Sequence, residues 1–251
     1  MYEDRALRKL YITAPSPCPY LPGRFERKLF APLHENDARH LNEMLTHAGF
    51  RRSQNVVYRP ACKRCKACVS VRVPVDRFRL TRGFRRVWKT NGDIAARLCP
   101  PRATSEQYSL FRRYVETRHN NGGMADMSMG DYASMVEDSH VETALVEYRY
   151  APDISLAQSG PPGPAKDGLA AVALTDRLTD GLSMIYSFFD PDRTHRSLGT
   201  YVILEHITRA KKMGLAYLYL GYWVSGSGKM DYKRRFLPQE HLTEAGWTLM
   251  E

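Results

Sequence analysis

The sequence lacks an apolar run long enough to cross a membrane. Its longest apolar runs, Leu169–Leu174 and Leu182–Phe189, fall well short of the roughly 20 residues that a transmembrane helix requires. The first residues also lack the apolar stretch of a secretory leader, because charged side chains stand there. We therefore expect a cytoplasmic protein that has no membrane-spanning segment.

Cysteine is scarce as well. Five cysteines form an odd set, and three of them, Cys62, Cys65 and Cys68, stand too close together for an ordinary disulfide framework. This crowding favours metal binding or reactive thiol chemistry over structural disulfides.

Acidic residues are few in the first half of the chain. Residues 1–118 contain 25 Lys and Arg against 10 Asp and Glu, a balance of +15, while residues 119–251 contain 12 against 17, a balance of −5; together they give the net charge of +10. The stretch from Arg51 to Lys89 holds 13 basic residues and one acid, Asp76. Most of the 13 are Arg, whose planar guanidinium suits phosphate. The stretch favours nucleic acid as a partner, although an ordinary basic surface has the same composition.

Hydrophobic periodicity predicts alternating helices and strands. We expect helices at 35–48, 82–91, 105–119 and 198–213. We expect strands at 56–58, 69–73, 141–149, 169–175, 182–189 and 217–223, and breaker-rich loops at 120–130 and 152–167. The strands between 141 and 189 predict an antiparallel meander, and the last strand, helix and strand predict a parallel crossover. The fold class is therefore α/β with a mixed sheet, and the prolines that follow Cys99 predict a domain boundary near residue 100.

The turn before the helix at 198–213 has the composition of an anion site. It reads Arg196-Ser197-Leu198-Gly199-Thr200-Tyr201. A helix start presents free backbone N–H groups and the positive end of the helix dipole to an anion. The pattern half matches the loop with which GNAT acetyltransferases hold the coenzyme A diphosphate, but a ring at Tyr201 would crowd a diphosphate. Ser197 as a plain N-cap and Gly199 as packing space explain the same residues.

The aromatic strand at 217–223 ends in a basic segment. Alternation places Tyr217, Tyr219 and Trp223 on one face and Tyr222 on the other, and Lys229 follows shortly after. Aromatic rings beside cations suit an unpaired nucleotide end. Core tyrosines whose hydroxyls bind backbone groups are the alternative.

The cysteine segment Cys62-Lys63-Arg64-Cys65-Lys66-Ala67-Cys68 has the spacing of a metal site. Three thiolates at this spacing suit one zinc ion or the start of an iron–sulfur run, and Cys18 is the natural fourth ligand. The neighbouring cations favour thiolates. A set of ordinary reduced cysteines is the alternative.

Several contiguous motifs that span nearly the whole chain resemble those of one family. They are Cys18 to Arg24, Gly49 to Asn55, Tyr58 to Cys68, Asp180 to Ser183, Arg196 to Tyr201, Tyr219 to Trp223, and Lys229-Met230-x-Tyr232-Lys233. On these residues the sequence resembles the bacterial aspartate/glutamate leucyltransferases, relatives of the eukaryotic arginyl-tRNA–protein transferases.

The resemblance implies a GNAT-like aminoacyltransferase domain at 101–251 behind a smaller, basic, cysteine-containing domain at 1–100. It implies transfer of leucine from leucyl-tRNA to the N-terminal α-amine of proteins that begin with Asp or Glu, which marks them for degradation. The chemistry requires no cofactor, and a zinc ion or iron–sulfur cluster at Cys18, Cys62, Cys65 and Cys68 is a separate expectation. The alternatives are an arginyl-tRNA-dependent transferase of the same family, a coenzyme A-dependent N-acyltransferase, and a zinc-containing RNA-binding module without activity.

An aminoacyl ester is already activated, so the protein needs only to hold both reactants and to stabilise the oxyanion. The candidates for the proton acceptor are Tyr186, Asp190 and Tyr222. The candidates for substrate binding are Arg196, Ser197, Gly199, Thr200, Lys229, Tyr232 and Lys233; Arg196 is the first choice for the acceptor's carboxylate and Lys229 the second. We expect Arg82, Arg85 and Arg86 to contact the tRNA backbone.

Overall fold

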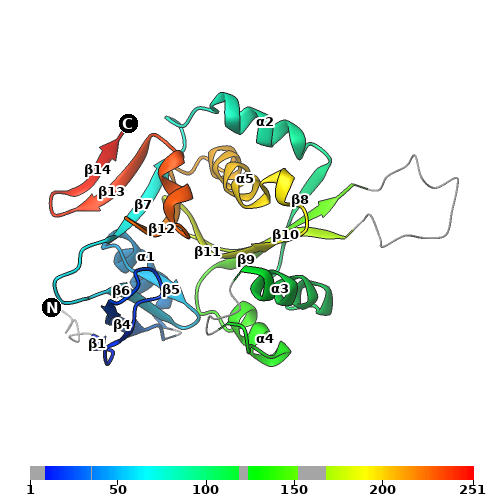
Figure 1. Cartoon of the computed structure of the whole chain (residues 1–251). Helices are drawn as coiled ribbons and strands as arrows, with labels where there is room; N and C mark the ends of the chain where they lie inside the picture. Colours follow the sequence, from blue (N-terminus) through cyan, green and yellow to red (C-terminus); the bar gives the residue numbers. More distant parts are fainter. Residues whose placement is uncertain (1–8, 35, 119–123, 152–167) are drawn as a thin grey trace, which may run out of the picture. The chain divides into compact units, whose positions relative to one another are not determined.

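The computed structural model describes residues 9–34, 36–118, 124–151 and 168–251 (Figure 1). The chain forms two compact units, each assembled from separate stretches of sequence. Unit 1 combines Met1–Val73, Ser139–Glu142 and Leu220–Glu251, and unit 2 combines Pro74–Asp138 and Thr143–Tyr219. The predicted domains 1–100 and 101–251 stay a prediction, and the loop expected at 152–167 lies outside the described residues. No helix among the described residues is both long and apolar enough to cross a membrane.

Unit 2 is built on a mixed sheet whose strands follow one another along the chain. They are β8 (Ile94–Cys99), β9 (Thr143–Tyr150), β10 (Leu169–Arg177), β11 (Gly181–Phe189) and the start of β12 (Tyr217–Val224). Neighbours from β8 to β11 pair antiparallel, whereas β11 and β12 pair in parallel from Gly181 with Tyr217 to Ser183 with Tyr219. Helix α5 (Leu198–Lys212) makes the crossover. The predicted meander and the predicted parallel crossover are confirmed.

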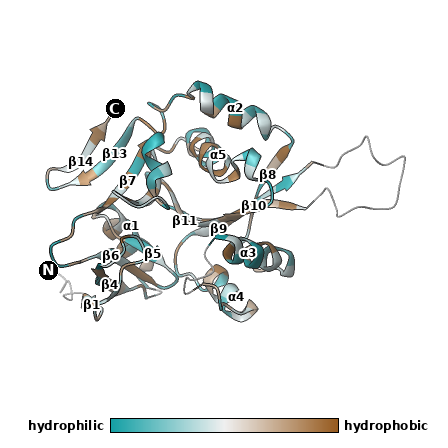
Figure 2. Ribbon diagram, viewed as in Figure 1, coloured by the Kyte–Doolittle hydropathy of each residue, from teal (hydrophilic) through white to brown (hydrophobic). Residues whose placement is uncertain are grey.

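Helices cover both faces of this sheet (Figure 1). Helices α3 (Ser105–Arg118) and α4 (Met129–Glu137) lie on one face, and α5, with α2 (Arg82–Thr90) packed on it, lies on the other. Because both faces are covered, β10 is buried at every position but the last, and its sequence is almost continuously apolar. Helix α2 has an exposed polar side, coloured teal in Figure 2, because four of its nine residues are Arg or Lys.

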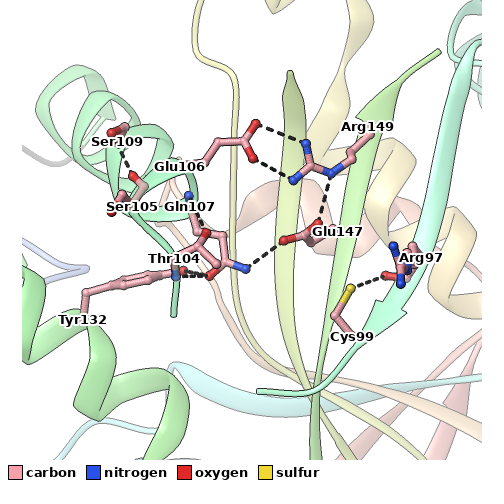
Figure 3. Close-up of polar contacts among 10 residues, drawn as sticks. All are labelled: Arg97, Cys99, Thr104, Ser105, Glu106, Gln107, Ser109, Tyr132, Glu147 and Arg149. Carbon is pink, nitrogen blue, oxygen red and sulfur yellow. Dashed lines mark hydrogen bonds and ion pairs between the residues drawn. The ribbon is translucent and has the colours of Figure 1, made fainter. Parts of the chain in front are cut away.

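A chain of polar contacts ties α3 and α4 to β9 (Figure 3). The hydroxyl of Tyr132 donates to Gln107 Oε1 at 3.2 Å, and Gln107 Nε2 donates to Glu147 Oε1 at 2.8 Å. Arg149 donates from Nε to Glu147 at 3.1 Å and binds Glu106 with both terminal nitrogens, at 3.1 and 2.7 Å. Buried polar groups that are paired in this way fix the relative position of the three elements without an unmet hydrogen bond.

Unit 1 contains a four-stranded antiparallel sheet in the order β1-β4-β6-β5. Its elements are β1 (Tyr11–Ile12), β4 (Lys28–Pro32), α1 (Ala38–His47), β5 (Arg51–Ser53) and β6 (Val56–Pro60). Helix α1 buries Ala38 and Leu41 against Ala31 and Val57 of the sheet. A short hairpin of β2 (Ser16–Pro17) and β3 (Phe25–Glu26) lies outside this sheet.

The rest of unit 1 combines a strand that ends near Val73 with the elements that follow β12. Strand β7 (Cys68–Pro74) pairs antiparallel with β13 (Gln239–Thr243), which pairs with β14 (Gly246–Met250). The short helix η3 (Asp231–Arg235) precedes β13. Strand β12 therefore begins in the sheet of unit 2 and carries its last five residues into unit 1.

Candidate active site

The pre-α5 loop, residues 190–197, connects the end of β11 to α5. It passes through a 3-10 turn at Thr194–Arg196, and Ser197 then takes a left-handed conformation with φ 53° and ψ 45°. The Ser197 carbonyl accepts the amides of Thr200 and Tyr201 at 2.9 and 3.1 Å. The amides of Leu198 and Gly199 lie in the first turn, where the helix itself offers no carbonyl to them. They are the groups at this helix start that can bind an anion.

Gly199 and Tyr201 have roles in packing that the sequence motif does not reveal. A Cβ on Gly199 would lie 2.9 Å from the ring of Phe189, so the glycine lets α5 start close to the end of β11. The Tyr201 ring is buried beside Trp88 and Tyr148, with ring centroids 5.6 and 6.0 Å away. The structure thus places this ring in the core, and the predicted crowding of a diphosphate is not seen.

Arg196 is held by an acid of the same unit. Its Nη1 and Nη2 donate to the two carboxylate oxygens of Asp93 at 2.7 and 3.0 Å, and its carbonyl accepts the side-chain amide of Asn91 at 2.9 Å. The hydrogen bond from Arg196 lowers the pKa of Asp93. The Arg196 side chain is only 20% exposed. An acceptor's carboxylate would have to displace Asp93 from it.

Asp190 is likewise engaged. Its Oδ1 accepts a hydrogen bond from Arg113 Nη2 at 2.8 Å, and the same nitrogen contacts Asp192 at 2.9 Å. Its amide donates to the Ala170 carbonyl at 2.9 Å. The carboxylate therefore fixes the end of β11 to α3.

The two candidate tyrosine hydroxyls differ in their surroundings. In unit 1, Tyr222 is within hydrogen-bond distance of the carbonyls of Gly49, at 2.9 Å, and Tyr58, at 3.0 Å. In unit 2, the buried Tyr186 hydroxyl has no hydrogen-bond partner among the described residues. Burial raises the pKa of both phenols far above neutrality. Neither is ionised at neutral pH, so neither is ready to accept a proton.

The segment after β12 contains one buried and one exposed lysine. Lys233 is 4% exposed, and its Nζ donates to the carbonyls of Leu220 and Tyr222, both at 2.7 Å. Burial, reinforced by the nearby Arg51, holds the pKa of Lys233 well below its ordinary value. Lys229 is exposed. Lys233 thus supports the backbone of β12, and Lys229 is the cation of this motif that solvent reaches.

Tyr232 lies in the segment after β12, and Gly221 lies within β12 itself. Tyr232 is 41% exposed, with Lys233 Nζ 6.0 Å from its ring centroid. Gly221 has φ +72°, and a Cβ there would overlap the Arg51 guanidinium, whose Nη1 donates to the Leu220 carbonyl at 3.4 Å. The glycine of the aromatic strand is therefore required by both its backbone conformation and its neighbour.

The three arginines expected at the tRNA backbone lie on α2. Arg82, Arg85 and Arg86 are exposed, and the helix buries Phe84 on its other side. Arg85 Nη1 donates to the Leu80 carbonyl at 3.0 Å, which leaves its other donors available. Among the described residues, no acid forms an ion pair with any of the three arginines.

Cys18, Cys62 and Cys65 lie close enough to Cys68 to influence its thiol, but among the described residues no three of these sulfurs lie within 4.8 Å of one another. Burial, followed by the charges of Cys62, Cys18 and Cys65, raises the pKa of the Cys68 thiol to about 12. All four thiols are half-buried and none is in a disulfide. The expected effect of the neighbouring cations is therefore not seen at Cys68, whose thiol stays protonated unless a metal ion displaces the proton.

Sequence reasoning missed the partners that hold these residues. Asp93 and Arg113 bind Arg196 and Asp190 from positions 103 and 77 residues away, and no local motif identifies them. Arg51 was visible only as one of many basic residues. An acid and a base three or four positions apart can be recognised in the sequence as a helix-surface ion pair. The pairs of Arg196 and Asp190 form only in the tertiary fold.

Two family models match the chain. The one described as "Arginine-tRNA-protein transferase, N terminus" matches residues 16–86, and the one described as "Arginine-tRNA-protein transferase, C terminus" matches residues 106–243, more than half of the chain. The chain belongs to this transferase family. The family resemblance predicted from the sequence is thus confirmed.

Relatives agree with this assignment. Proteins named aspartate/glutamate leucyltransferase from Xanthobacter autotrophicus, Azorhizobium caulinodans and Bradyrhizobium sp. strain ORS 278 are 61%, 60% and 58% identical to this chain. The alignments cover 99%, 98% and 99% of this chain and 98%, 97% and 95% of the relatives. The structure of FemX is similar with a TM-score of 0.52 at 9% identity, over 85% of this chain and 69% of FemX. This likeness concerns the fold, which is the predicted GNAT-like acyltransferase fold.

Proposed function

We propose that this protein transfers leucine from leucyl-tRNA to the N-terminal α-amine of proteins that begin with Asp or Glu, which marks them for degradation. The observation that carries the proposal is the near full-length identity of 58–61% to proteins named aspartate/glutamate leucyltransferase. Membership of the tRNA–protein transferase family and the GNAT-like fold support acyl transfer as the reaction class. The reaction places the protein in the cytoplasm, with leucyl-tRNA and proteins that begin with Asp or Glu as partners.

In the proposed reaction the neutral α-amine attacks the ester carbonyl of leucyl-tRNA. A peptide bond forms, the bond to the terminal ribose oxygen breaks, and the proton lost by the amine ends on that ribose hydroxyl. An α-amine has a pKa of about 7.7–8.0, so part of it is neutral at pH 7. The described surroundings of Tyr186, Asp190 and Tyr222 offer no strong base, which fits a reaction driven by orientation and by stabilisation of the oxyanion.

We assign the donor side to the start of α5. Ser197, Gly199 and Thr200 shape its first turn, and the amides of Leu198 and Gly199 are suited to the oxyanion or to the terminal ribose oxygens. Arg196, held by Asp93, acts as a positioning residue for this turn. Asp190 positions the preceding loop through Arg113.

We assign recognition of the acceptor's carboxylate to Lys229. It is an exposed cation, and among the described residues no acid pairs with it. Tyr232 lies three residues further on and offers a half-exposed ring and hydroxyl. Lys233 stabilises the same segment, because its Nζ donates hydrogen bonds to two carbonyls of β12.

We infer that Cys18, Cys62, Cys65 and Cys68 are the residues that would hold a zinc ion or an iron–sulfur cluster. The four sulfurs come from two chain segments, and among the described residues no three of them lie within 4.8 Å of one another, so binding would require them to move closer. Thiolate ligation would then tie the β2–β3 hairpin to the turn before β7. No step of the transfer depends on it. Elemental analysis of protein purified without oxygen tests this: zinc or iron should copurify and should be lost from Cys62→Ser, and metal-free protein of unchanged stability and activity contradicts the site.

The proposed function is tested with purified protein, radiolabelled leucyl-tRNA and peptides that begin with Asp, Glu, Asn, Gln or Ala. We expect label in the Asp and Glu peptides and at least tenfold less in the amides, because a cation facing the acceptor is left unpaired by them. Transfer from arginyl-tRNA but not from leucyl-tRNA would show that the protein is an arginyl-tRNA-dependent transferase of the same family. Acylation from an acyl-coenzyme A, or tRNA binding without transfer, would contradict the proposal.

A pair of variants tests the donor assignment and the acceptor assignment separately. Lys229→Met should raise KM for the Asp peptide about tenfold and leave KM for leucyl-tRNA unchanged, and Lys229→Arg should recover most of the loss. Arg196→Ala should lower kcat and leave the preference for acidic acceptors intact. If Lys229→Met keeps its KM while Arg196→Ala loses the preference for acids, the acceptor assignment belongs to Arg196.

A further inference from the structure

A cavity of about 490 Å³ lies beside the cysteine turn of unit 1. Its lining includes Arg24, Phe25, Arg27, Lys63 and Arg64, and we call it the cationic hollow. It is separate from α2 and from the pre-α5 loop in sequence, and neither the motifs of α5 nor those of β12 account for it. Four cations and an aromatic ring around one cavity raise the question of which ligand they fit.

The backbone builds this cavity from two segments that lie far apart in the sequence. The Cys18 amide donates to the Arg24 carbonyl at 2.8 Å, which closes the loop between β2 and β3. The Ala61 amide donates to the Arg27 carbonyl at 2.7 Å, which holds the start of the cysteine turn against the same hairpin. The cations are therefore brought together by main-chain hydrogen bonds, and their clustering does not depend on side-chain conformation alone.

Among the described residues, no acid neutralises the charges of the hollow. Glu26, the acid nearest in sequence, pairs with Lys28 at 2.9 Å. Arg27 is fixed by a hydrogen bond from Nε to the Thr13 carbonyl at 3.0 Å, and Arg24, Lys63 and Arg64 have no acidic partner among the described residues. Like charges around one cavity repel each other, and a bound anion with several oxygens removes that repulsion.

Phe25 adds a second feature, because its ring is 67% exposed at the same cavity. An exposed ring beside cations is the arrangement on which an unpaired base stacks while its phosphate meets guanidinium groups. The cavity lies in the usual size range of small-ligand pockets, roughly 300–1,000 Å³. A single aspartate side chain would fill little of it.

We propose that the cationic hollow binds an unpaired nucleotide of the tRNA, with its base on Phe25 and its phosphate between Arg24, Lys63 and Arg64. The proposal rests on the proposed function, which supplies the tRNA. It assigns to the cysteine-containing half of the chain a direct contact with the donor, distinct from the charge on α2.

The test uses the full-length protein and measures the dissociation constant for leucyl-tRNA between 50 and 200 mM salt, a range over which phosphate contacts are resolved. Arg24→Ala/Arg64→Ala should weaken binding by at least tenfold and lower the slope of log K against log salt by about 1–2. Phe25→Ala should weaken binding about fivefold with the slope unchanged, and Phe25→Trp should bind as the parent does. The matched control is Lys66→Ala/Arg102→Ala, which removes two exposed charges outside the hollow.

The outcomes separate this inference from the proposed function. If the parent protein transfers leucine to an Asp peptide while all hollow variants bind tRNA within twofold of it, the inference alone is overturned. If the double variant raises KM for the Asp peptide and leaves tRNA affinity unchanged, the hollow is an acceptor site and the inference is also overturned. If the parent protein binds tRNA through the hollow but transfers nothing, the proposed function fails and the nucleotide site stands. Circular dichroism of each variant shows that the fold is retained.

Discussion

Helix α2 and the pre-α5 loop are both segments of unit 2 that contain arginines, yet the arginines differ in their partners. Arg82, Arg85 and Arg86 of α2 point to solvent. Arg196 of the pre-α5 loop is bound by both oxygens of Asp93. A cation that has its acid within the fold contributes to structure, whereas an exposed cation is available to an external anion. Removing charge at the two places should therefore change different properties of the protein.

The largest effect is expected from α2. Arg82→Ala/Arg85→Ala/Arg86→Ala should weaken leucyl-tRNA binding more than tenfold at low salt and lower the salt slope by roughly 2–3, because each lost phosphate contact reduces counterion release. Filter binding at several salt concentrations measures both. Arg102→Ala/Arg118→Ala/Lys212→Ala removes the same charge elsewhere in unit 2. An equal loss of leucyl-tRNA affinity in the two triple variants would mean that only the net charge of the protein matters. It would contradict a specific role for α2.

Lys233 extends the comparison to unit 1, since it is a lysine that is almost completely buried within the fold. Lys233→Met leaves the carbonyls of Leu220 and Tyr222 without this donor, and we expect a loss of about 2 kcal/mol in the free energy of unfolding. Urea unfolding of this variant beside Lys229→Met, which alters an exposed lysine, measures the difference. Equal stability of the two variants would show that the buried ammonium contributes nothing to the strand.

Arg196 should show a smaller effect on stability. The ion pair with Asp93 is partly exposed, so Arg196→Ala is expected to lower the free energy of unfolding by about 1 kcal/mol. The salt slope of tRNA binding should not move, in contrast to the α2 variant. Asp93→Asn keeps one oxygen that can accept a hydrogen bond from Arg196, so it should lose less stability than Arg196→Ala. A flattened slope in Arg196→Ala would place this guanidinium on the tRNA and contradict its role as a positioning residue.

The smallest effect concerns a group that the fold keeps uncharged. His206 is fully buried in α5, with Nδ1 2.8 Å from the Val202 carbonyl and Nε2 2.9 Å from the Thr175 hydroxyl. Burial lowers its pKa, so as the pH falls below about 6.5 the unfolded chain binds a proton before the folded chain does. The free energy of unfolding should then decrease, by at most about 1.4 kcal/mol per pH unit, until the folded pKa is reached.

Urea unfolding at pH 7.0, 6.0 and 5.0 measures this dependence. His206→Gln should flatten it, while His195→Gln, which alters an exposed histidine of the pre-α5 loop, should retain it. The same slope in both variants would assign the pH dependence to other groups.

The sequence predicted the elements whose pattern is local. The meander and crossover around α5 were predicted because β10, β11 and β12 are long apolar runs and α5 has regular helical spacing. Helix α4 was missed because Gly130 resembled a loop residue, although the capping box from Ser128 to Asp131 gave a signal. Strand β8 was missed because Ile94–Cys99 has no clear alternation, and its pairing with β9 decides its conformation.

For the candidate site, the sequence predicted which segments matter better than what each residue does. Ser197 and Gly199 lie at a helix start as expected. Lys233 was predicted to bind substrate, but it is buried and its Nζ contacts the backbone of β12. The sequence alone does not distinguish this buried lysine from the exposed Lys229. The partners of Arg196 and Asp190 come from distant segments, and only the folded chain identifies them.

The contact between Asp93 and Arg196 joins positions 103 residues apart. Closing so long a stretch of chain is unfavourable until the intervening strands are in place, so this contact forms after the meander during folding. Its loss should accelerate unfolding and leave the rate of refolding nearly unchanged. We therefore expect the ion pair at the start of α5 to slow unfolding of the site. The strands that form before it set the folding rate.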